Sequence, residues 1–367
     1  MSKAPNYWDY IRVEDLLALQ GGLGQETDLD NDEVLFVTVH QVFELWFKLV
    51  LRETTSLRNF FHQKVVEDQA MSNAVRSIRR VVTLLRQCVS HFEVMETLST
   101  RSYLGFRDKL TPASGFQSAQ MRQIEILFGL EDSERIDLAP GEGYMKALRD
   151  HQGGESPAIE RVLEQKKNGP SLISSVEGWL YRTPIDGSQH DDPGAEAVLE
   201  RFIVAYAAAQ SKELDGTLKL AMARTRQSEG KARIEARYEA ERKALRDFLN
   251  PTEEEGGARR KRVRAAALFI LSYRELPLLA WPRDVLDGLI ELEQVFIIFR
   301  QRHARMVERV IGRRTGTGAS SGVDYLDQTA LTYRIFKDLW AVRTYQIPLR
   351  ANPRLENAAF YGFQYDE

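Results

Sequence analysis

The sequence predicts an almost all-α protein, and two observations lead to this conclusion. Apolar residues recur at helical spacing through most of the 367 residues, and no alternating strand pattern of useful length is found. The clearest example runs from Asp32 to about Phe61, with Asn31, Asp32 and Glu33 providing capping and dipole-matched charge at its start. Its apolar residues form a wide stripe on one side of the expected helix.

Further helices are expected at about 69–98, 116–129, 193–227, 229–249, 258–273, 283–312 and 324–345. Residues 111–116 interrupt two helical stretches, and residues 165–193, which contain three prolines, are expected to form a long irregular connection. The stretch 229–249 carries charges all round, which is typical of a solvated helix, with an oligomer contact as the alternative.

Composition limits the class of protein. The 50 basic residues nearly balance the 53 acidic ones, so no charge field for nucleic acid or a membrane surface is expected. The single cysteine, Cys88, excludes a disulfide framework and is expected to be buried packing rather than a nucleophile. The N-terminal residues have no apolar core of signal-peptide length, and the run read as the most apolar, Ala265 to Tyr273, is too short to span a bilayer. A soluble, cytoplasmic protein is predicted.

One segment, residues 300–326, combines a histidine with a loop of small and hydroxyl residues. His303 lies in a helical pattern that ends in Gly316-Thr317-Gly318-Ala319-Ser320-Ser321-Gly322. Such a helix and loop can offer an imidazole nitrogen and backbone N–H groups, which suit a cofactor and the polar end of a small substrate. His303 alone reads as a surface histidine, but the apolar residues on its helix favour the neutral imidazole that haem iron needs.

Two other helices carry candidate ligand-binding residues. Phe36 and His40 are four residues apart and share a helix face, where a satisfied core histidine is the alternative. Tyr103 and Arg107 have the same spacing, and a guanidinium beside a phenol suits a carboxylate, although a structural salt bridge is common. The N-terminal YWDY motif, with Tyr7 and Tyr10, suggests docking on this chain or on a neighbour. Zinc-hydrolase, nucleophile-elbow and phosphate-loop motifs are absent from the sequence.

Several motifs together resemble the tryptophan 2,3-dioxygenase family. They are LFVTVHQVFELWFK at 35–48, FRDKLTPASGFQS at 106–118, GWLYRTP at 178–184, RHARMVERVIGRRTGTGASSGVDYL at 302–326 and TYRIFKDLWAVRTYQIP at 332–348. The resemblance runs from about Tyr7 to Pro348. It implies a single helical domain over 1–367, with an inserted polar helical segment at about 222–262.

The resemblance also implies roles for individual residues. His303 matches the proximal histidine that ligates the iron of haem b, and His40 matches the distal histidine that hydrogen-bonds the indole N–H. The remaining residues implied to contact the substrate are Phe36, Tyr103, Arg107, Thr317, Tyr7 and Tyr10, and Gly316, Gly318 and Ser320 are expected beside the cofactor. Tyr7 and Tyr10 would reach a neighbouring subunit's site, because the family forms a homotetramer (a dimer of dimers) with an intersubunit pocket.

The implied reaction is cleavage of the indole 2,3 bond of L-tryptophan by O2, giving N-formylkynurenine. The loop departs from the family pattern at Ala319, where a second glycine is usual, which puts the placement of Thr317 in question. A monooxygenase that converts tryptophan or a substituted tryptophan to a 2-oxindole therefore stays open. A haem-binding or helical scaffold without turnover is a third alternative. The HQxxELWFK signature argues against the indoleamine dioxygenases.

Overall fold

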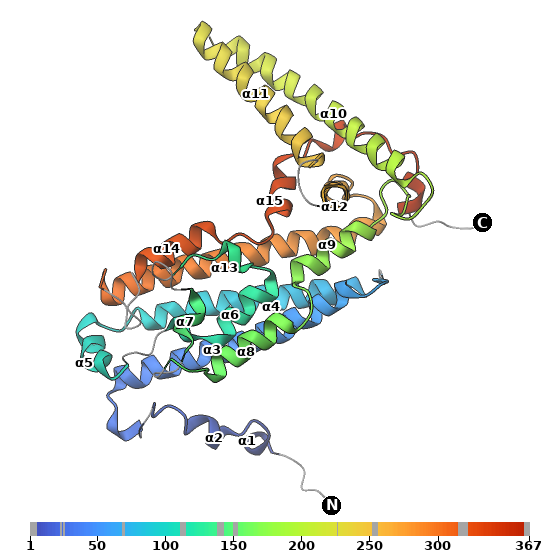
Figure 1. The fold of residues 1–367 in the computed structure, drawn as a ribbon. Helices are drawn as coiled ribbons and strands as arrows, with labels where there is room; N and C mark the ends of the chain where they lie inside the picture. Colours follow the sequence, from blue (N-terminus) through green and yellow to red (C-terminus); the bar gives the residue numbers. More distant parts are fainter. Residues whose placement is uncertain are drawn as a thin grey trace, which may run out of the picture. The chain divides into compact units, whose positions relative to one another are not determined.

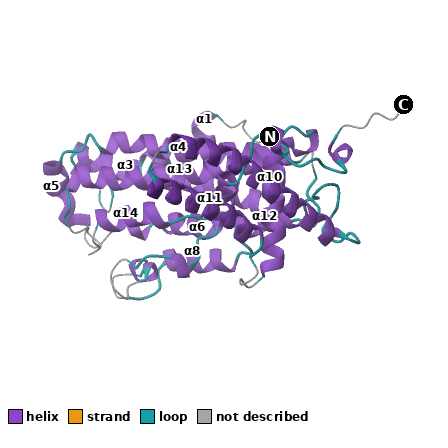
Figure 2. Cartoon of the chain, turned by 90° about the horizontal axis from the view of Figure 1, so that it is seen from above, coloured by secondary structure: helices purple, strands orange, loops and turns teal. Residues whose placement is uncertain are grey.

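A computed structural model describes residues 6–22, 24, 26–67, 70–110, 115–137, 143–149, 153–225, 227–251, 256–314 and 322–362. Over these ranges the regular structure is helical, and the only β-type pairing is an isolated bridge between Ile185 and Ser188. Figure 2 accordingly shows helices joined by loops, without a strand. The predicted all-α class is confirmed.

The chain forms two compact units. Unit 1 contains residues 1–53, 80–169 and 294–333, and unit 2 contains residues 54–79, 170–293 and 334–367. Three long helices contribute to both units: α3 (Asn31–His62), α4 (Met71–Met95) and α13 (Ala280–Ile311). The predicted insertion at about 222–262 falls within unit 2, and the prediction of one domain over 1–367 stays a prediction.

Two helices of unit 1 begin at recognisable side-chain caps. α3 begins at Asn31, and the preceding Asp30 accepts a hydrogen bond from the Glu33 N–H at 2.8 Å. Ser118 caps α6 by accepting from the N–H of Met121 at 3.2 Å. The helices of this unit, besides the long ones, are α1 (Tyr7–Tyr10), α2 (Val13–Leu17), α5 (Thr100–Leu110), α6 (Ala119–Phe128), α7 (Tyr144–Ala147), α8 (Pro157–Lys167) and α14 (Val323–Thr332), with short 3-10 turns at Glu26–Asp28, Gly115–Gln117 and Asp132–Glu134.

α3 is the one helix among the described residues that is long and apolar enough to cross a membrane by length and composition. This differs from our sequence reading, in which the run at 265–273 is the most apolar. Phe43, Phe47 and Val50 of α3 are buried in the protein core, so core packing accounts for the apolar stripe. We therefore assign α3 as a core helix.

Unit 2 surrounds a helix that is buried on all sides. In α12 (Gly257–Ser272), every residue from Arg262 to Ser272 is buried. The guanidinium of Arg262 donates to the carbonyl oxygens of Tyr181 at 2.9 Å and Ser188 at 3.3 Å, so its charge is solvated by backbone dipoles. The other helices of this unit are α9 (Leu172–Arg182), α10 (Ala195–Arg224), α11 (Ser228–Leu249) and α15 (Lys337–Thr344), with 3-10 turns at Pro277–Leu279, Leu349–Ala351 and Ala358–Tyr361.

The irregular connection expected at 165–193 is wrong, because helix α9 occupies Leu172–Arg182. Ser171 caps it by accepting from the N–H of Ser174, and Trp179 and Leu180 lie in the core. Pro170 and Pro184 stand just outside its two ends. They therefore mark the limits of a helix and do not interrupt one.

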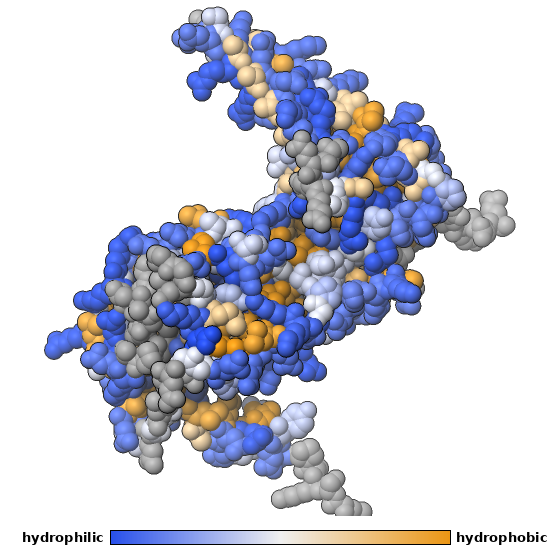
Figure 3. Space-filling view, viewed as in Figure 1, coloured by the Kyte–Doolittle hydropathy of each residue, from blue (hydrophilic) through white to orange (hydrophobic). Residues whose placement is uncertain are grey.

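The polar helix α11 follows α10 directly and runs back along it as a helical hairpin (Figure 1). Only its last turn is buried, at Leu245, Phe248 and Leu249. The hairpin surface in view is mainly hydrophilic (Figure 3). This agrees with the expectation of a solvated polar helix.

The predicted helix at 324–345 is two helices, α14 and α15, separated by Tyr333 to Phe336. The buried carboxylate of Glu293 accepts hydrogen bonds from the N–H groups of Ile335 and Phe336. Within unit 2, these bonds satisfy the two backbone N–H groups that precede α15. A polar side chain from another helix thus ends a pattern that periodicity alone would continue.

The C-terminal segment is tied to the loop that follows α9. Asp186 accepts from the N–H groups of Glu356 and Asn357 at 3.1 and 2.8 Å. The buried phenol of Tyr361 donates to the carbonyl of Pro184 and accepts from the N–H of Gly187, both at 3.0 Å. Gly187 has a φ of +79°, and an added Cβ would lie 2.9 Å from the Cβ of Asn357. These bonds fix residues 356–361 in unit 2.

Candidate functional site

Phe36 and His40 share one face of α3, as predicted, with ring centroids 4.2 Å apart. The Nδ1 atom of His40 lies 2.7 Å from the carbonyl oxygen of Phe36. Because a carbonyl can only accept, Nδ1 carries the proton, and the lone pair of the neutral ring is on Nε2. Burial lowers the pKa of His40 and outweighs the opposing effects of the Phe36 carbonyl and Glu44. The ring is therefore a neutral hydrogen-bond acceptor at Nε2.

α5 brings Tyr103 and Arg107 to the same place. The Tyr103 ring lies 6.0 Å from that of Phe36, and Phe106 packs against both. Arg107 donates a hydrogen bond to the Tyr103 phenol. Burial raises the pKa of Tyr103, and Arg107 partly offsets this, so the phenol stays protonated at neutral pH. The predicted pairing of a guanidinium and a phenol is present.

His303 lies on α13, enclosed by aromatic rings. Phe92 of α4 is stacked on it with centroids 5.6 Å apart and an interplanar angle of 7°, and Phe299 lies 6.2 Å away. Burial lowers the pKa of His303 to about 4, with smaller contributions from His40, Arg300 and Arg122. The ring is thus neutral at physiological pH, and the surface reading of His303 does not hold.

A run of aromatic rings joins the two histidines. Phe43 lies 6.4 Å from His40 and 5.2 Å from Phe92, and Phe92 in turn stacks on His303. Two neutral imidazoles therefore share one apolar environment within unit 1. A neutral imidazole in apolar, aromatic surroundings is chemically suited to a haem.

The donor chemistry of His303 also fits a haem. Among the described residues, we find no protein group that hydrogen-bonds either of its nitrogens, so a lone pair is free for a metal. No group of three or more His, Cys, Asp or Glu side chains able to hold a bare metal ion occurs in those residues either. A single histidine suits an iron whose other ligands come from a porphyrin.

Glu44 belongs to this site, and our sequence reasoning did not identify its role. Its carboxylate accepts from the Ser118 hydroxyl at 2.6 Å and from Gln120 Nε2 at 2.7 Å. Ser118 is also the N-cap of α6, so one hydroxyl joins α6 to the helix that carries His40. The HQxxELWFK and PASGFQS motifs contained part of the signal, because Glu44 lies in the first and Ser118 ends the second, with Gln120 two residues later.

The structure does not bring every predicted residue to the site. Tyr7 and Tyr10 are 73% and 79% exposed, so they do not dock on the described part of their own chain. The nearby segment is held instead by Gln41, which donates to the Leu19 carbonyl at 2.7 Å and accepts from Gln20 at 2.8 Å. Loop residues Gly316, Thr317, Gly318, Ala319 and Ser320 lie outside the described residues.

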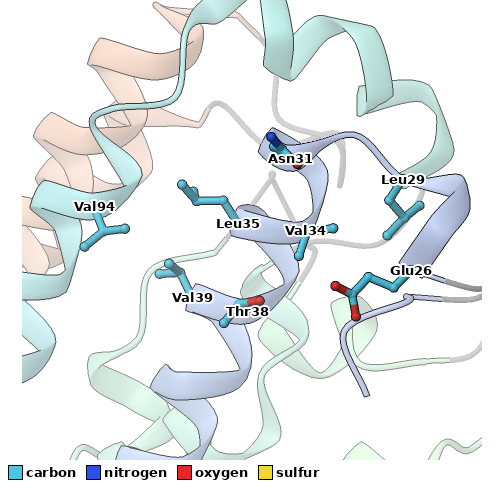
Figure 4. A pocket seen from close by; sticks show the side chains of 8 residues that line it. All are labelled: Glu26, Leu29, Asn31, Val34, Leu35, Thr38, Val39 and Val94. Atoms are coloured by element: carbon cyan, nitrogen blue, oxygen red, sulfur yellow. The ribbon is translucent and has the colours of Figure 1, made fainter. Parts of the chain in front are cut away.

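A hollow of about 440 Å³ lies against the first turns of α3. Leu35 and Val39 line it, whereas Phe36 and His40, one position further along the helix, do not (Figure 4). The hollow is thus on a different flank of α3 from Phe36 and His40. Cys88 is fully buried and burial raises the pKa of its thiol to about 12, which confirms packing and excludes an activated nucleophile.

Comparison with known proteins gives a consistent result. The family model described as Tryptophan 2,3-dioxygenase matches residues 1–346. The chain is 52% identical to "Tryptophan 2,3-dioxygenase" of Sorangium cellulosum, over all of this chain and 89% of the relative. It is 49% identical to "Tryptophan 2,3-dioxygenase 2" of Ralstonia nicotianae, over 98% of both chains.

A third relative is the "Tryptophan 2,3-dioxygenase-like protein" of Xanthomonas campestris pv. campestris. It is 48% identical over 72% of this chain and 98% of the relative. Taken with the nearly full-length family match, these similarities confirm the resemblance drawn from the motifs. The chain belongs to the tryptophan 2,3-dioxygenase family.

Proposed function

We propose that this protein is a haem-dependent dioxygenase that cleaves the indole 2,3 bond of L-tryptophan with O2 to give N-formylkynurenine. The observation that carries the proposal is the pair of neutral, enclosed histidines, His40 and His303, connected by aromatic rings beside the Tyr103–Arg107 pair. The family membership supports the same activity.

Haem b is the proposed cofactor, and His303 would hold its iron, because the neutral ring has a lone pair available for a metal. When bound, haem supplies the redox chemistry with O2 that no amino-acid side chain provides. The neighbouring Phe92 and Phe299 supply apolar surface beside the imidazole, and the stacked Phe92 restrains the plane of the ring. We also propose that Gly316, Gly318 and Ser320 lie beside the cofactor.

His40 is the proposed acceptor of the indole N–H. Its proton is held on Nδ1 by the Phe36 carbonyl, so Nε2 is free to accept. Phe36 and Phe106 offer aromatic surface to the indole ring. Because the His40 ring is neutral, its Nε2 atom has a lone pair that can accept the indole N–H.

Arg107 and Tyr103 are the proposed ligands of the substrate carboxylate. The guanidinium supplies the charge and a planar pair of N–H donors, and Tyr103 supplies a protonated phenol. Thr317 is proposed to contact the ammonium and carboxylate end of the substrate. Tyr7 and Tyr10, exposed on this chain, are proposed to reach the site of a neighbouring subunit in a homotetramer. The proposed location is the cytoplasm, with no nucleic-acid or membrane partner.

The deciding experiment supplies tryptophan and ¹⁸O₂ to the ferrous, haem-loaded protein and measures the product mass. Two retained labelled atoms support the dioxygenase. One retained atom replaces it with the monooxygenase that forms a 2-oxindole, and unchanged tryptophan leaves a haem-binding protein without turnover. His303→Ala tests the ligand separately, because a normal histidine-ligated haem spectrum in that variant contradicts the assignment.

A further inference from the structure

A cluster of arginines is buried one helical turn from His303. Its centre is the fully buried carboxylate of Glu125 on α6. Arg122 donates to both carboxylate oxygens at 2.9 and 3.1 Å, Arg135 donates at 2.5 Å, and Arg300 of α13 donates at 2.7 Å. Although burial alone would raise the pKa of Glu125, these three cations hold it well below its usual range. The carboxylate is therefore ionised.

The cluster has more positive than negative charge. Three guanidinium groups, none more than 10% exposed, share the single buried carboxylate of Glu125. At the edge of the cluster, Asp132 forms ion pairs with Lys166 at 2.5 Å and with the Nε atom of Arg135 at 3.4 Å, and Asp132 and Lys166 together add no net charge. Two positive charges therefore remain uncompensated among these residues. The buried Nε atom of Arg122 also has no hydrogen-bond partner among the residues that the structure describes.

Aromatic rings contact the guanidinium groups of the cluster. The guanidinium of Arg300 lies between the rings of Phe296 and Tyr333, at 4.6 and 4.8 Å from their centroids. Arg135 lies 4.3 Å from the centroid of Tyr144. Such contacts stabilise a cation without neutralising it, so the positive field of the cluster persists in a low-dielectric region.

This field reaches His303. Arg300 precedes His303 by three residues on α13, which is almost one turn, and so the two residues lie on neighbouring parts of the helix surface. After burial and His40, the charges of Arg300 and Arg122 are further causes that lower the pKa of the His303 ring. The Arg300–Glu125 bond also connects α13 to α6 and fixes the rotation of α13 at this turn.

We propose that the Glu125–Arg122–Arg135–Arg300 cluster is a positioning and charge-setting device for His303, which raises the reduction potential of the haem iron bound there. Positive charge near an iron centre favours its reduced form, because oxidation adds a further positive charge. This inference rests on the proposed function, since it needs a haem on His303. None of the four side chains is assigned to the substrate or to the reaction.

The test measures the haem midpoint potential in variants with opposite changes of charge. Arg300→Gln removes a cation and is expected to lower the midpoint potential. At a fixed applied potential, the ferrous-to-ferric ratio should change by about tenfold. Arg300→Lys keeps the charge and should have a midpoint potential close to that of the wild type. Glu125→Gln removes the anion and should raise the potential.

Arg302→Gln is the matched control, because it removes a cation adjacent to His303 that is 35% exposed and paired with Glu96 at 3.0 Å. Solvent screens that charge, so a smaller change is expected. Equal shifts of the midpoint potential in Arg300→Gln and Arg300→Lys, or no shift in either variant, overturn the proposal. The comparison of these two variants is sufficient even if Glu125→Gln does not fold. A wild-type protein without a histidine-ligated haem spectrum instead overturns the proposed function.

Discussion

His40 Nδ1 lies 2.7 Å from the carbonyl oxygen of Phe36, one turn earlier on the same helix. This bond decides which nitrogen of the ring carries the proton, and burial keeps the ring neutral by lowering its pKa. Two properties of a candidate active-site residue thus follow from its own helix and its enclosure.

The acid limb of the kcat/KM profile is expected below pH 6.5, because the lowered pKa of His40 keeps Nε2 an acceptor there. His40→Ala should reduce kcat/KM for tryptophan but have much less effect on 1-methyltryptophan, which has no indole N–H. Steady-state kinetics of both enzymes with both substrates, from pH 5 to 8, provide the check. Equal losses with the two substrates would contradict the hydrogen bond to the indole.

Arg107→Ala is expected to weaken substrate binding by roughly 2–5 kcal/mol, because a desolvated carboxylate loses its charged partner. The main effect should be on KM. Tyr103→Phe removes one neutral contact and should cost about 1 kcal/mol. Tryptamine lacks the carboxylate and is the control substrate. If Arg107→Ala weakens the binding of tryptamine as much as the binding of tryptophan, the result is evidence against this role.

Ser118→Ala should destabilise the protein by about 1–3 kcal/mol, since it removes the cap of α6 and a donor to Glu44. Ser171→Ala removes the cap of α9, a side chain with no carboxylate partner among the described residues, and should cost about 1 kcal/mol. Urea unfolding gives both values. Only the change at Ser118 is expected to raise KM for tryptophan, because it loosens the helix beside His40.

The stability of the haem-free protein should depend on pH through His303. Its pKa is about 4 in the folded chain, against about 6.5 when unfolded. The unfolded state therefore takes up the proton first, and stability present above pH 6.5 is lost progressively down to about pH 4. Between pH 6.5 and 5 the loss from this group is about 2 kcal/mol. In His303→Gln the free energy of unfolding should fall less over that interval, and an identical fall would refute the prediction.

Two helical glycines provide a matched pair for testing packing. At Gly288 of α13, a Cβ would lie 2.8 Å from Cγ2 of Ile78, whereas nothing lies within 4 Å of a Cβ at Gly216 of α10. Gly288→Ala should therefore destabilise by about 1–3 kcal/mol from overpacking. Gly216→Ala should stabilise by up to about 1 kcal/mol from helix propensity. Thermal unfolding of both variants measures the two changes, which should be opposite in sign.

The long helices could be predicted because their signal is local. Apolar spacing located α3, α10, α11, α12 and α13 to within a few residues at most ends. The break between α14 and α15 could not be found this way, because it depends on Glu293, more than 40 residues earlier. α9 was missed because flanking prolines were read as part of an irregular segment.

The candidate site was only partly accessible to sequence reasoning. His40, Tyr103, Arg107 and His303 stood out through their residue types and motifs. Glu44 did not, because a helical glutamate gains its role from partners 74 and 76 residues later. Arg300 pairs with Glu125 across 175 positions, and no local pattern distinguishes such an arginine from one on the surface.

The family match ends at residue 346, yet the chain beyond it is not an appendage. Asp186 and Tyr361 bind residues 356–361 to the loop after α9, and the Tyr361 ring packs 5.3 Å from that of Phe269 in the buried helix α12. A shortened expression clone that stops at the family boundary would lose the partner of that ring and leave the Asp186 carboxylate without its two backbone donors. An affinity tag for purification therefore belongs after Gly362.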